Sequence, residues 1–139
     1  MNTSSAISEL QHLLGAQSVL DKTQDLVLYE FDGSIEKSAP DCVVFPTSTE
    51  DVVKIVKIVQ KYNLPLVGRG AGTGLSGGTI PVDGGVMIAF ARMNKILEID
   101  LENEYAVVQP GVVNLDITTT VQSNGYYYAP DPSSQKACT

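Results

Sequence analysis

The 139-residue sequence has two cysteines, one histidine and no long apolar run. Cys42 and Cys138 are too few for a disulfide framework, and Cys42 lies within an apolar run, where it is expected to be a small buried side chain. The single histidine, His12, falls on a short helical pattern without partners. That position is typical of a surface residue rather than of a metal ligand or a catalytic base.

Basic residues are outnumbered, because nine lysines and arginines stand against 16 acidic residues, giving a formal net charge of −7 at pH 7. Binding to the phosphate backbone of nucleic acids needs a basic face, so nucleic acid is not an expected partner. The first 20 residues lack the basic start and apolar run of a secretory signal. No segment approaches the apolar length of a membrane span, and we therefore expect a cytoplasmic protein.

Glycine is concentrated in one stretch, since six of the 12 glycines lie between Val67 and Gly78, which reads VGRGAGTGLSGG. Glycine adopts positive φ without steric cost and leaves the backbone open to close approach. Such a loop turns successive backbone N–H groups toward one point, where they bind an anion. Arg69 adds a positive charge, and Thr73 and Ser76 add hydroxyl groups. The stretch therefore predicts a site for a phosphate or pyrophosphate.

Two familiar phosphate loops do not fit this stretch. A Walker A loop is excluded because no Gly-Lys-Ser/Thr is present. Gly72, Gly74 and Gly77 match the dinucleotide pattern Gly-x-Gly-x-x-Gly, with Glu98 about 20 residues further on. That pattern needs a helix directly after the loop. The segment 79–85 contains one proline and two glycines and cannot be the interior of a helix, so the dinucleotide pattern does not apply here. A flexible surface loop that binds nothing is the remaining alternative.

The spacing of apolar residues predicts short helices and strands in an α+β fold. Helices are expected at 5–14, 49–62 and 114–123, strands at 41–45, 64–67, 86–90, 97–102, 105–109 and 126–128, and a packed turn without a chemical role at 24–34. The strand, helix and strand between 41 and 67 form a βαβ unit, so the glycine loop leaves the carboxyl end of a parallel strand. Ligands bind at that edge in open α/β sheets.

The ends of two helices and one buried face are also expected from the sequence. Overlapping capping boxes, Thr47 with Glu50 and Ser48 with Asp51, mark the start of the first long helix, and Asn63 is expected to end it. Asn114 is expected to cap the helix that follows it, and Asn124-Gly125 is expected to stop that helix. In the helix at 49–62, four apolar residues at helical spacing form the expected buried stripe: Val52, Ile55, Val56 and Val59.

Three groups of residues receive structural interpretations. Glu98, Asp100 and Glu102 alternate with apolar residues, so they are expected on the solvent face of an otherwise buried strand, in an antiparallel sheet that starts near residue 96. Without a histidine beside them they are not interpreted as a metal site. The three tyrosines at 126–128 are expected in the core or at a sheet edge. Arg92, at a strand end, is interpreted as structural. No catalytic residue is identified.

The stretch from Arg69 to Gly78 resembles the pyrophosphate loop of FAD-binding flavoproteins of the vanillyl-alcohol-oxidase (PCMH) type. It is most similar to the branch that contains the FAD-binding chain of glycolate oxidase and D-lactate dehydrogenase. The resemblance covers roughly residues 25–139 and continues, in the family's order, through four further motifs: Pro46–Val52, Arg92–Ile96, Gln109–Val112 and Pro130–Ser134. Gly68 departs from the pattern, because many relatives carry proline there.

The resemblance implies a division of the chain. An N-terminal helix and packed turn at 1–38 precede a truncated FAD-binding PCMH-type domain at 39–139. In that domain a small parallel βαβ subdomain at 39–92 is followed by the start of an antiparallel α/β subdomain at 96–139. Relatives continue into another glycine-rich segment and a cap domain with the substrate-side residues. The chain is therefore expected to be the N-terminal part of a longer flavoenzyme, or a truncated copy, that binds FAD poorly and turns nothing over by itself.

The resemblance also implies the cofactor and its contacts. The loop amides hold the FAD pyrophosphate, and the segment after residue 130 lies along the flavin or its ribityl chain. Relatives with covalent flavin use a histidine in this loop, which is absent here, so non-covalent FAD is expected. The implied cofactor-binding residues are Arg69, Gly70, Ala71, Gly72, Thr73, Gly74, Leu75, Ser76, Gly77, Gly78, Gly111, Pro130, Asp131, Ser133 and Ser134.

The activity that the resemblance implies is oxidation of a small 2-hydroxy acid, of the glycolate or D-lactate type, with hydride transfer from its α-carbon to FAD. Two alternatives stay open. The first is another PCMH-type oxidoreductase, acting on an ether lipid, a sugar or an enolpyruvyl compound. The second is a nucleotide-binding fragment without activity. Iron–sulfur or flavoprotein partner subunits, and the electron acceptor, are also left open.

Overall fold

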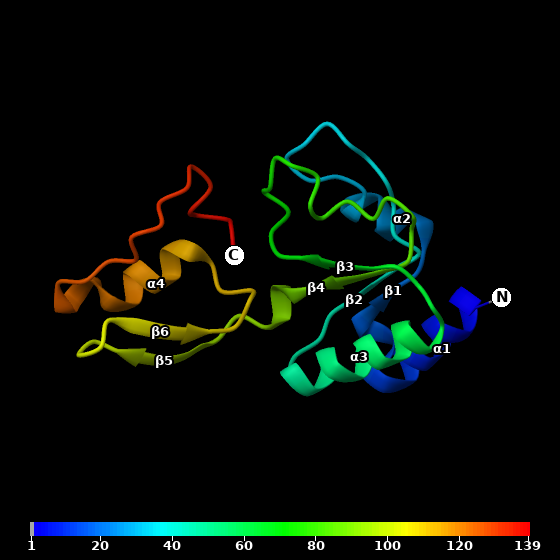
Figure 1. Cartoon of the computed structure of the whole chain (residues 1–139), viewed down its shortest axis with the longest axis horizontal. Helices are drawn as coiled ribbons and strands as arrows, with labels where there is room; N and C mark the ends of the chain where they lie inside the picture. The colour runs from blue at the N-terminus through cyan, green and yellow to red at the C-terminus, as the bar shows by residue number, and fades with distance from the viewer. Residues whose placement is uncertain (1) are drawn as a thin grey trace.

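The computed structural model, which describes residues 2–139, contains two β-sheets that lie beside each other (Figure 1). The first sheet has four strands in the order β1-β2-β4-β3: β1 (Val19–Leu20), β2 (Cys42–Val44), β3 (Leu66–Arg69) and β4 (Val86–Ala89). The second sheet is a hairpin of β5 (Ile96–Asp100) and β6 (Tyr105–Val108). The expected α+β class is confirmed, with a parallel sheet followed by an antiparallel one.

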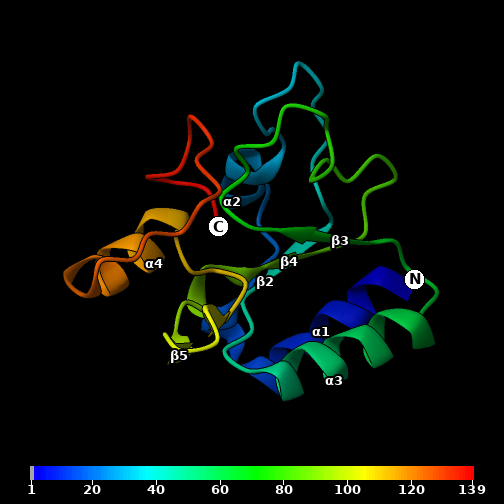
Figure 2. The ribbon, with the colours of Figure 1, turned by 60° about the vertical axis from the view of Figure 1, so that its left-hand side comes forward.

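Four α-helices accompany the sheets in the described part of the chain: α1 (Asn2–Leu14), α2 (Thr23–Leu26), α3 (Thr49–Lys61) and α4 (Asn114–Val121). Helices α1 and α3 lie on one face of the first sheet, whereas α2 lies on the other face (Figure 2). The turn expected at 24–34 is therefore partly helical, because α2 continues into a 3₁₀ turn at Val27–Tyr29. None of the helices described between residues 2 and 139 is both long enough and apolar enough to cross a membrane.

Strands β2, β4 and β3 run parallel, with β4 in the middle. The expected βαβ unit is confirmed, although its two strands pair with β4 rather than with each other. Because parallel strands end at the same edge of a sheet, the loop after β3 begins at the carboxyl edge. The strand expected at 64–67 lies two residues later, so Arg69 belongs to β3 and pairs with Ala89. The sequence did not predict β1, which pairs antiparallel with β2 at the sheet edge.

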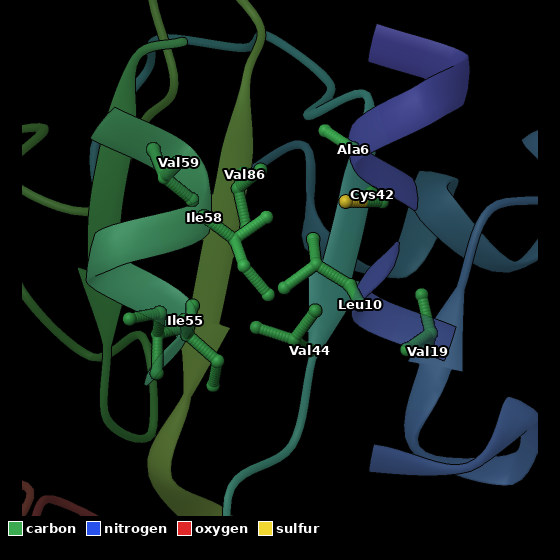
Figure 3. Close-up of a cluster of buried hydrophobic side chains, with 10 residues drawn as sticks. Ala6, Leu10, Val19, Cys42, Val44, Ile55, Ile58, Val59 and Val86 are labelled. Atoms are coloured by element: carbon green, nitrogen blue, oxygen red, sulfur yellow. The ribbon is translucent and has the colours of Figure 1, made fainter. Parts of the chain in front are cut away.

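Strands β2 and β4 are buried along their whole length. Alternate residues face opposite sides, so Cys42, Val44 and Val86 pack against α1 and α3 (Figure 3). Val43 and Met87 pack on the other side of the sheet, near Leu26 of α2 and other apolar residues. This confirms that the apolar run at 86–90 is a strand covered on both faces.

Helix α3 begins and ends where the sequence predicts. Ser48 is the N-cap, and its hydroxyl accepts from the Asp51 N–H at 3.1 Å. At the other end Asn63 adopts φ 52°. The N–H of Leu64 donates to Val59 O and that of Asn63 to Gln60 O, which is a Schellman motif with asparagine in the left-handed position.

The buried stripe of α3 differs from the expected one at two positions. Val56 is 40% exposed, whereas Ile58, which was not expected to be buried, is 9% exposed. Ile55 and Val59 are buried as predicted. The difference arises because α1 packs beside α3 and extends the buried side of the helix toward Ile58.

Three expectations for the second half of the chain are wrong. Leu97 is 59% exposed, and it lies at a β-bulge between Ile96 and Glu98, which shifts the register and interrupts the alternation of faces there. The segment 126–128 is not a strand, and all three tyrosines are exposed. Its backbone follows α4 instead, since the Tyr128 N–H donates to the Thr118 hydroxyl at 3.0 Å.

The third wrong expectation is the cap at Asn114, which is the first residue of α4 and makes no capping bond. The N–H groups of Asn114 and Leu115 already donate to Cys138 O and Gln135 O. Because these carbonyls satisfy the free donors of the helix start, a side-chain cap is not needed there. The stop at Gly125 is confirmed, with φ 81°.

The corrected stripe of α3 predicts a difference between two identical substitutions. Val59→Ala removes buried methyl groups and is expected to lower the free energy of unfolding by about 2 kcal/mol. Val56→Ala, at a side chain that is 40% exposed, is expected to cost about 0.5 kcal/mol or less. Urea unfolding followed by circular dichroism measures both, and equal losses would contradict the observed orientation of α3.

The two cysteines are expected to differ in reactivity. Burial, aided by the charge of Asp41, raises the pKa of the Cys42 thiol to about 12. Because the thiolate is the reactive form, Cys42 stays neutral and unreactive at pH 8, whereas the half-buried Cys138 reacts. A disulfide reagent should label one thiol in the folded chain and two in urea. The Cys138→Ser variant is the control, and fast labelling of that folded variant would overturn the prediction.

Candidate functional site

The glycine loop, residues 70–78, follows β3 at the carboxyl edge of the first sheet (Figure 1). It contains no regular secondary structure. Gly72 and Gly77 lie in the left-handed region, with φ 72° and 70°. A side chain added at Gly74 or Gly78 would meet no atom within 4 Å. The loop therefore uses glycine for two purposes, to turn the backbone and to leave part of it open.

The donors of this loop are free, whereas some of its acceptors are used. In the structure of residues 2–139, no backbone N–H from Ala71 to Gly78 donates to a protein acceptor. The carbonyl of Gly74, in contrast, accepts from the Gly33 N–H at 2.9 Å, and that of Gly77 accepts from the Ile80 N–H at 3.0 Å. A run of free N–H groups in a left-handed, glycine-rich turn is the chemistry that binds an anion.

The side chain of Arg69 points into the protein rather than into solvent. It is 8% exposed. Its Nη1 donates to Phe31 O at 2.8 Å and lies 3.4 Å from Thr79 Oγ1. Its Cζ lies 5.7 Å from the centre of the Tyr29 ring. The positive charge that the sequence places in the loop is thus held beneath the loop by protein partners.

A turn at residues 31–34 packs against the glycine loop, and the sequence did not predict this contact. A side chain at Gly33 would lie 2.8 Å from Gly74 O. Asp32 is 9% exposed, and hydrogen bonds from Ser34, with one from Thr79, hold the pKa of its carboxyl below the usual range. The dipeptide Asp32-Gly33 signalled a turn, but nothing in the sequence indicated what the turn would contact.

The end of the described chain also reaches the loop. A Cβ at Gly70 would collide with the Thr139 hydroxyl, so Thr139 lies directly against the start of the loop. Sequence reasoning did not include Thr139 in the site. Pro130, Asp131 and Ser133 are exposed, and the Pro130 carbonyl accepts from the Asn114 side chain on α4.

The remaining predicted site residues occupy different surroundings. Gly111 is buried, and a side chain there would collide with Phe90 O, so it packs between the two sheets. Leu75 is 79% exposed. Ser76 lies at a shallow hollow of about 380 Å³ between the loop and Glu36–Ser38. The structure thus brings the ten residues Arg69–Gly78 together and adds Thr139 to them.

Two other features lie outside this site. Arg92 donates to the Ser18 hydroxyl at 2.8 Å and to Gln17 O at 3.2 Å, which confirms its structural role. A larger hollow of about 520 Å³ lies between the hairpin, α4 and the tyrosines at 126–128. No group of three His, Cys, Asp or Glu side chains that could hold a metal ion occurs among residues 2–139.

Residues 40–139 match a protein family described as the FAD binding domain. The chain belongs to this family. FAD is therefore its cofactor, and the resemblance seen in the glycine loop is confirmed. The free N–H groups of the loop fit the pyrophosphate of that cofactor.

The relatives of this FAD-binding chain are oxidoreductases. It is 41% identical over 140 residues to glycolate oxidase subunit GlcD of Bacillus subtilis, covering 100% of this chain and 30% of that protein. It is 42% identical over 138 residues to the GlcD of Escherichia coli K12, covering 99% and 28%. The D-lactate dehydrogenase of Anaerostipes hadrus is 41% identical over 101 residues, covering 73% and 21%.

Solved structures agree with this placement. Alkyldihydroxyacetonephosphate synthase superposes with a TM-score of 0.87 at 26% identity, covering 98% of this chain and 28% of that one. p-Cresol methylhydroxylase superposes with a TM-score of 0.80 at 31% identity, covering 89% and 25%. The PCMH-type fold is therefore confirmed. The chain spans at most 30% of the length of the relatives named here.

Glycines that turn the loop and glycines that leave it open are expected to differ in how much stability is lost on substitution by alanine. At Gly72 the backbone has φ 72°, and a Cβ would collide with the Arg69 guanidinium. Gly72→Ala is expected to lower the free energy of unfolding by about 1–3 kcal/mol. At Gly74 a Cβ meets open space, so Gly74→Ala is the matched control and is expected to change stability by about 0.5 kcal/mol or less.

Chemical denaturation of the two variants measures the difference. A Gly72→Ala variant as stable as Gly74→Ala would show that the loop does not adopt the left-handed turn beside Arg69.

Proposed function

We propose that this chain is the FAD-binding portion of a flavin-dependent oxidoreductase that acts on 2-hydroxy acids of the glycolate or D-lactate type. The observation that carries the proposal is the run of free backbone N–H groups from Ala71 to Gly78 at the carboxyl edge of a parallel sheet. The glycolate oxidase and D-lactate dehydrogenase relatives favour this substrate class. The boundaries 1–38, 39–92 and 96–139 are proposed for its parts.

In this proposal the loop binds the FAD pyrophosphate with neutral donors. Backbone N–H groups carry partial positive charge and need no counter-ion, which suits a pyrophosphate bound without a metal. The hydroxyls of Thr73 and Ser76 add donors on the same loop. Gly77 and Gly78 let the flavin end approach the backbone, and the segment Pro130–Ser134 is proposed to lie along the flavin or ribityl chain.

When bound, FAD supplies the redox chemistry by accepting a hydride from the α-carbon of the substrate. This chain supplies binding and orientation. A base for the hydroxyl and a cation for the carboxylate are also required. Arg69 and Arg92, the two arginines of the sequence, are both engaged in protein contacts. We therefore propose no catalytic residue between residues 2 and 139.

Binding of FAD is expected to depend on its phosphates. Titration calorimetry of the chain with FAD, FMN and riboflavin should show the tightest binding for FAD and none for riboflavin, which lacks phosphate. The melting temperature should rise only with the ligands that bind. Gly74→Ala, in contrast to its neutral effect on stability, is expected to weaken FAD binding by narrowing the open part of the loop. Equal affinity for FAD and riboflavin would overturn the proposal.

The bond to FAD is proposed to be non-covalent, because the loop has no histidine. Acid precipitation of the FAD-loaded chain should leave the yellow flavin in solution. A yellow protein pellet would contradict this.

A chimera joins this chain to the part of Bacillus subtilis GlcD beyond the matched segment, with unmodified GlcD as the control. Because the GlcD part is expected to supply the substrate-side residues, the chimera tests whether this chain serves as the FAD-binding portion of a 2-hydroxy-acid enzyme. Anaerobic addition of glycolate or D-lactate should bleach the flavin absorbance of the FAD-loaded chimera.

A second candidate is an enzyme like alkyldihydroxyacetonephosphate synthase, favoured by the TM-score of 0.87 over 98% of the chain. A chimera that folds and holds FAD but is bleached by neither acid, while the control is bleached, would favour that candidate.

Two further points are proposals about the whole protein. The GlcD relatives are named as subunits of glycolate oxidase, so partner subunits, of iron–sulfur or flavoprotein type, are proposed for this protein as well. A cytoplasmic location is proposed as well.

A further inference from the structure

Three segments meet at the guanidinium of Arg69: the end of β3, the end of the glycine loop and the turn at 31–34. Nη1 donates to Phe31 O at 2.8 Å and lies 3.4 Å from Thr79 Oγ1. Thr79 Oγ1 lies 3.2 Å from Asp32 Oδ2. Because arginine only donates and a carboxylate only accepts, the Thr79 hydroxyl accepts from Arg69 and donates to Asp32.

Both charged ends of this chain of contacts are removed from water. Arg69 is 8% exposed and Asp32 is 9% exposed. Buried charges persist where hydrogen bonds satisfy them, and here the Ser34 N–H also donates to Asp32 at 2.8 Å. The Cζ of the guanidinium also lies over the Tyr29 ring, 5.7 Å from its centre. Its charge is therefore already compensated by the protein.

The glycine loop depends on contacts outside it for its order more than most loops do. Its glycines have the largest conformational freedom to lose on ordering, and the backbone N–H groups of residues 71–78 form no internal bonds that would order them. Arg69 and Thr79 stand at the two ends of this segment. Between them, the backbone at Gly72 packs directly on the guanidinium.

We propose that Arg69 is a positioning residue for FAD. Through Thr79 and Asp32 it fixes both ends of the glycine loop on the turn at 31–34, and the loop N–H groups, rather than the guanidinium, contact the pyrophosphate. This inference rests on the proposed function. The contacts of Arg69 preorganise the loop, because a loop already held in its bound conformation loses less entropy when the ligand binds.

The first test needs no ligand. Backbone ¹⁵N order parameters of the full chain report whether residues 70–78 are rigid, with values near 0.85 for rigid backbone and below about 0.6 for flexible backbone. Thr79→Val removes the hydroxyl while keeping the shape of the side chain, and Thr79→Ser keeps the hydroxyl. Order parameters of the loop should fall in Thr79→Val and stay near the wild-type values in Thr79→Ser. Arg69→Met should lower them as well.

The second test uses FAD itself. Thr79→Val should weaken FAD binding about threefold to tenfold, because it removes one hydroxyl from the contacts that hold the loop while the bond from Arg69 to Phe31 O remains, and Thr79→Ser should restore the affinity. Arg69→Met should weaken binding about tenfold or more, and adding Thr79→Val to it should weaken binding little further, because both act through one set of contacts. The salt dependence of the FAD affinity should be the same in Arg69→Met as in the wild type, since the guanidinium does not meet the phosphates.

The outcomes separate the two proposals. A loop that stays rigid in Thr79→Val and Arg69→Met would overturn the positioning role. The positioning role would also be overturned if Arg69→Met lost FAD affinity while Thr79→Val did not, and if the FAD affinity of Arg69→Met depended less on salt. That result would show direct contact between the guanidinium and the pyrophosphate. If Arg69→Met does not fold, the Thr79→Val and Thr79→Ser pair decides by itself. A wild-type chain that binds riboflavin as well as FAD would overturn the proposed function, while the order parameters still decide whether Arg69 holds the loop.

Discussion

The buried strand β4 is the constraint on which the rest of the structure depends. Its four residues, Val86–Ala89, are buried and lie between β2 and β3. Apolar residues on both faces require a layer on each side, which α1 and α3 supply on one side and α2 on the other. Because both neighbours of β4 are parallel to it, three strand ends meet at one edge, and the chain leaves β3 there as the glycine loop.

At that edge the backbone itself forms the candidate site. The loop has free backbone N–H donors from Ala71 to Gly78 and uses the carbonyls of Gly74 and Gly77 in contacts with the protein. This division gives the loop a partial positive character in a chain whose formal charge is −7. The charged side chain at its base is buried and paired through Thr79 with a carboxylate. Neutral donors and a compensated charge together suit the pyrophosphate of FAD.

Features set by residues close in sequence were predicted correctly, whereas features set by segments distant in sequence were not. Capping at Ser48, the left-handed Asn63 and the stop at Gly125 involve residues close in sequence, and all three were predicted. The exposure of Val56 was predicted incorrectly because α1, distant in sequence, decides which side of α3 is buried. The tyrosines at 126–128 were predicted as a strand because their side chains favour one, but the backbone there finds a partner on α4 instead.

The sequence by itself determined the parallel βαβ unit, the position of the glycine loop after its second strand and the family that this loop resembles. Each of these rests on a local pattern, either a repeat of apolar residues or a run of glycines that no ordinary strand or helix tolerates. The tertiary structure alone decided that Arg69 points inward, that Gly33 meets Gly74 and that Thr139 lies against Gly70. These contacts join segments far apart in the chain, and no local pattern in either segment specifies the other.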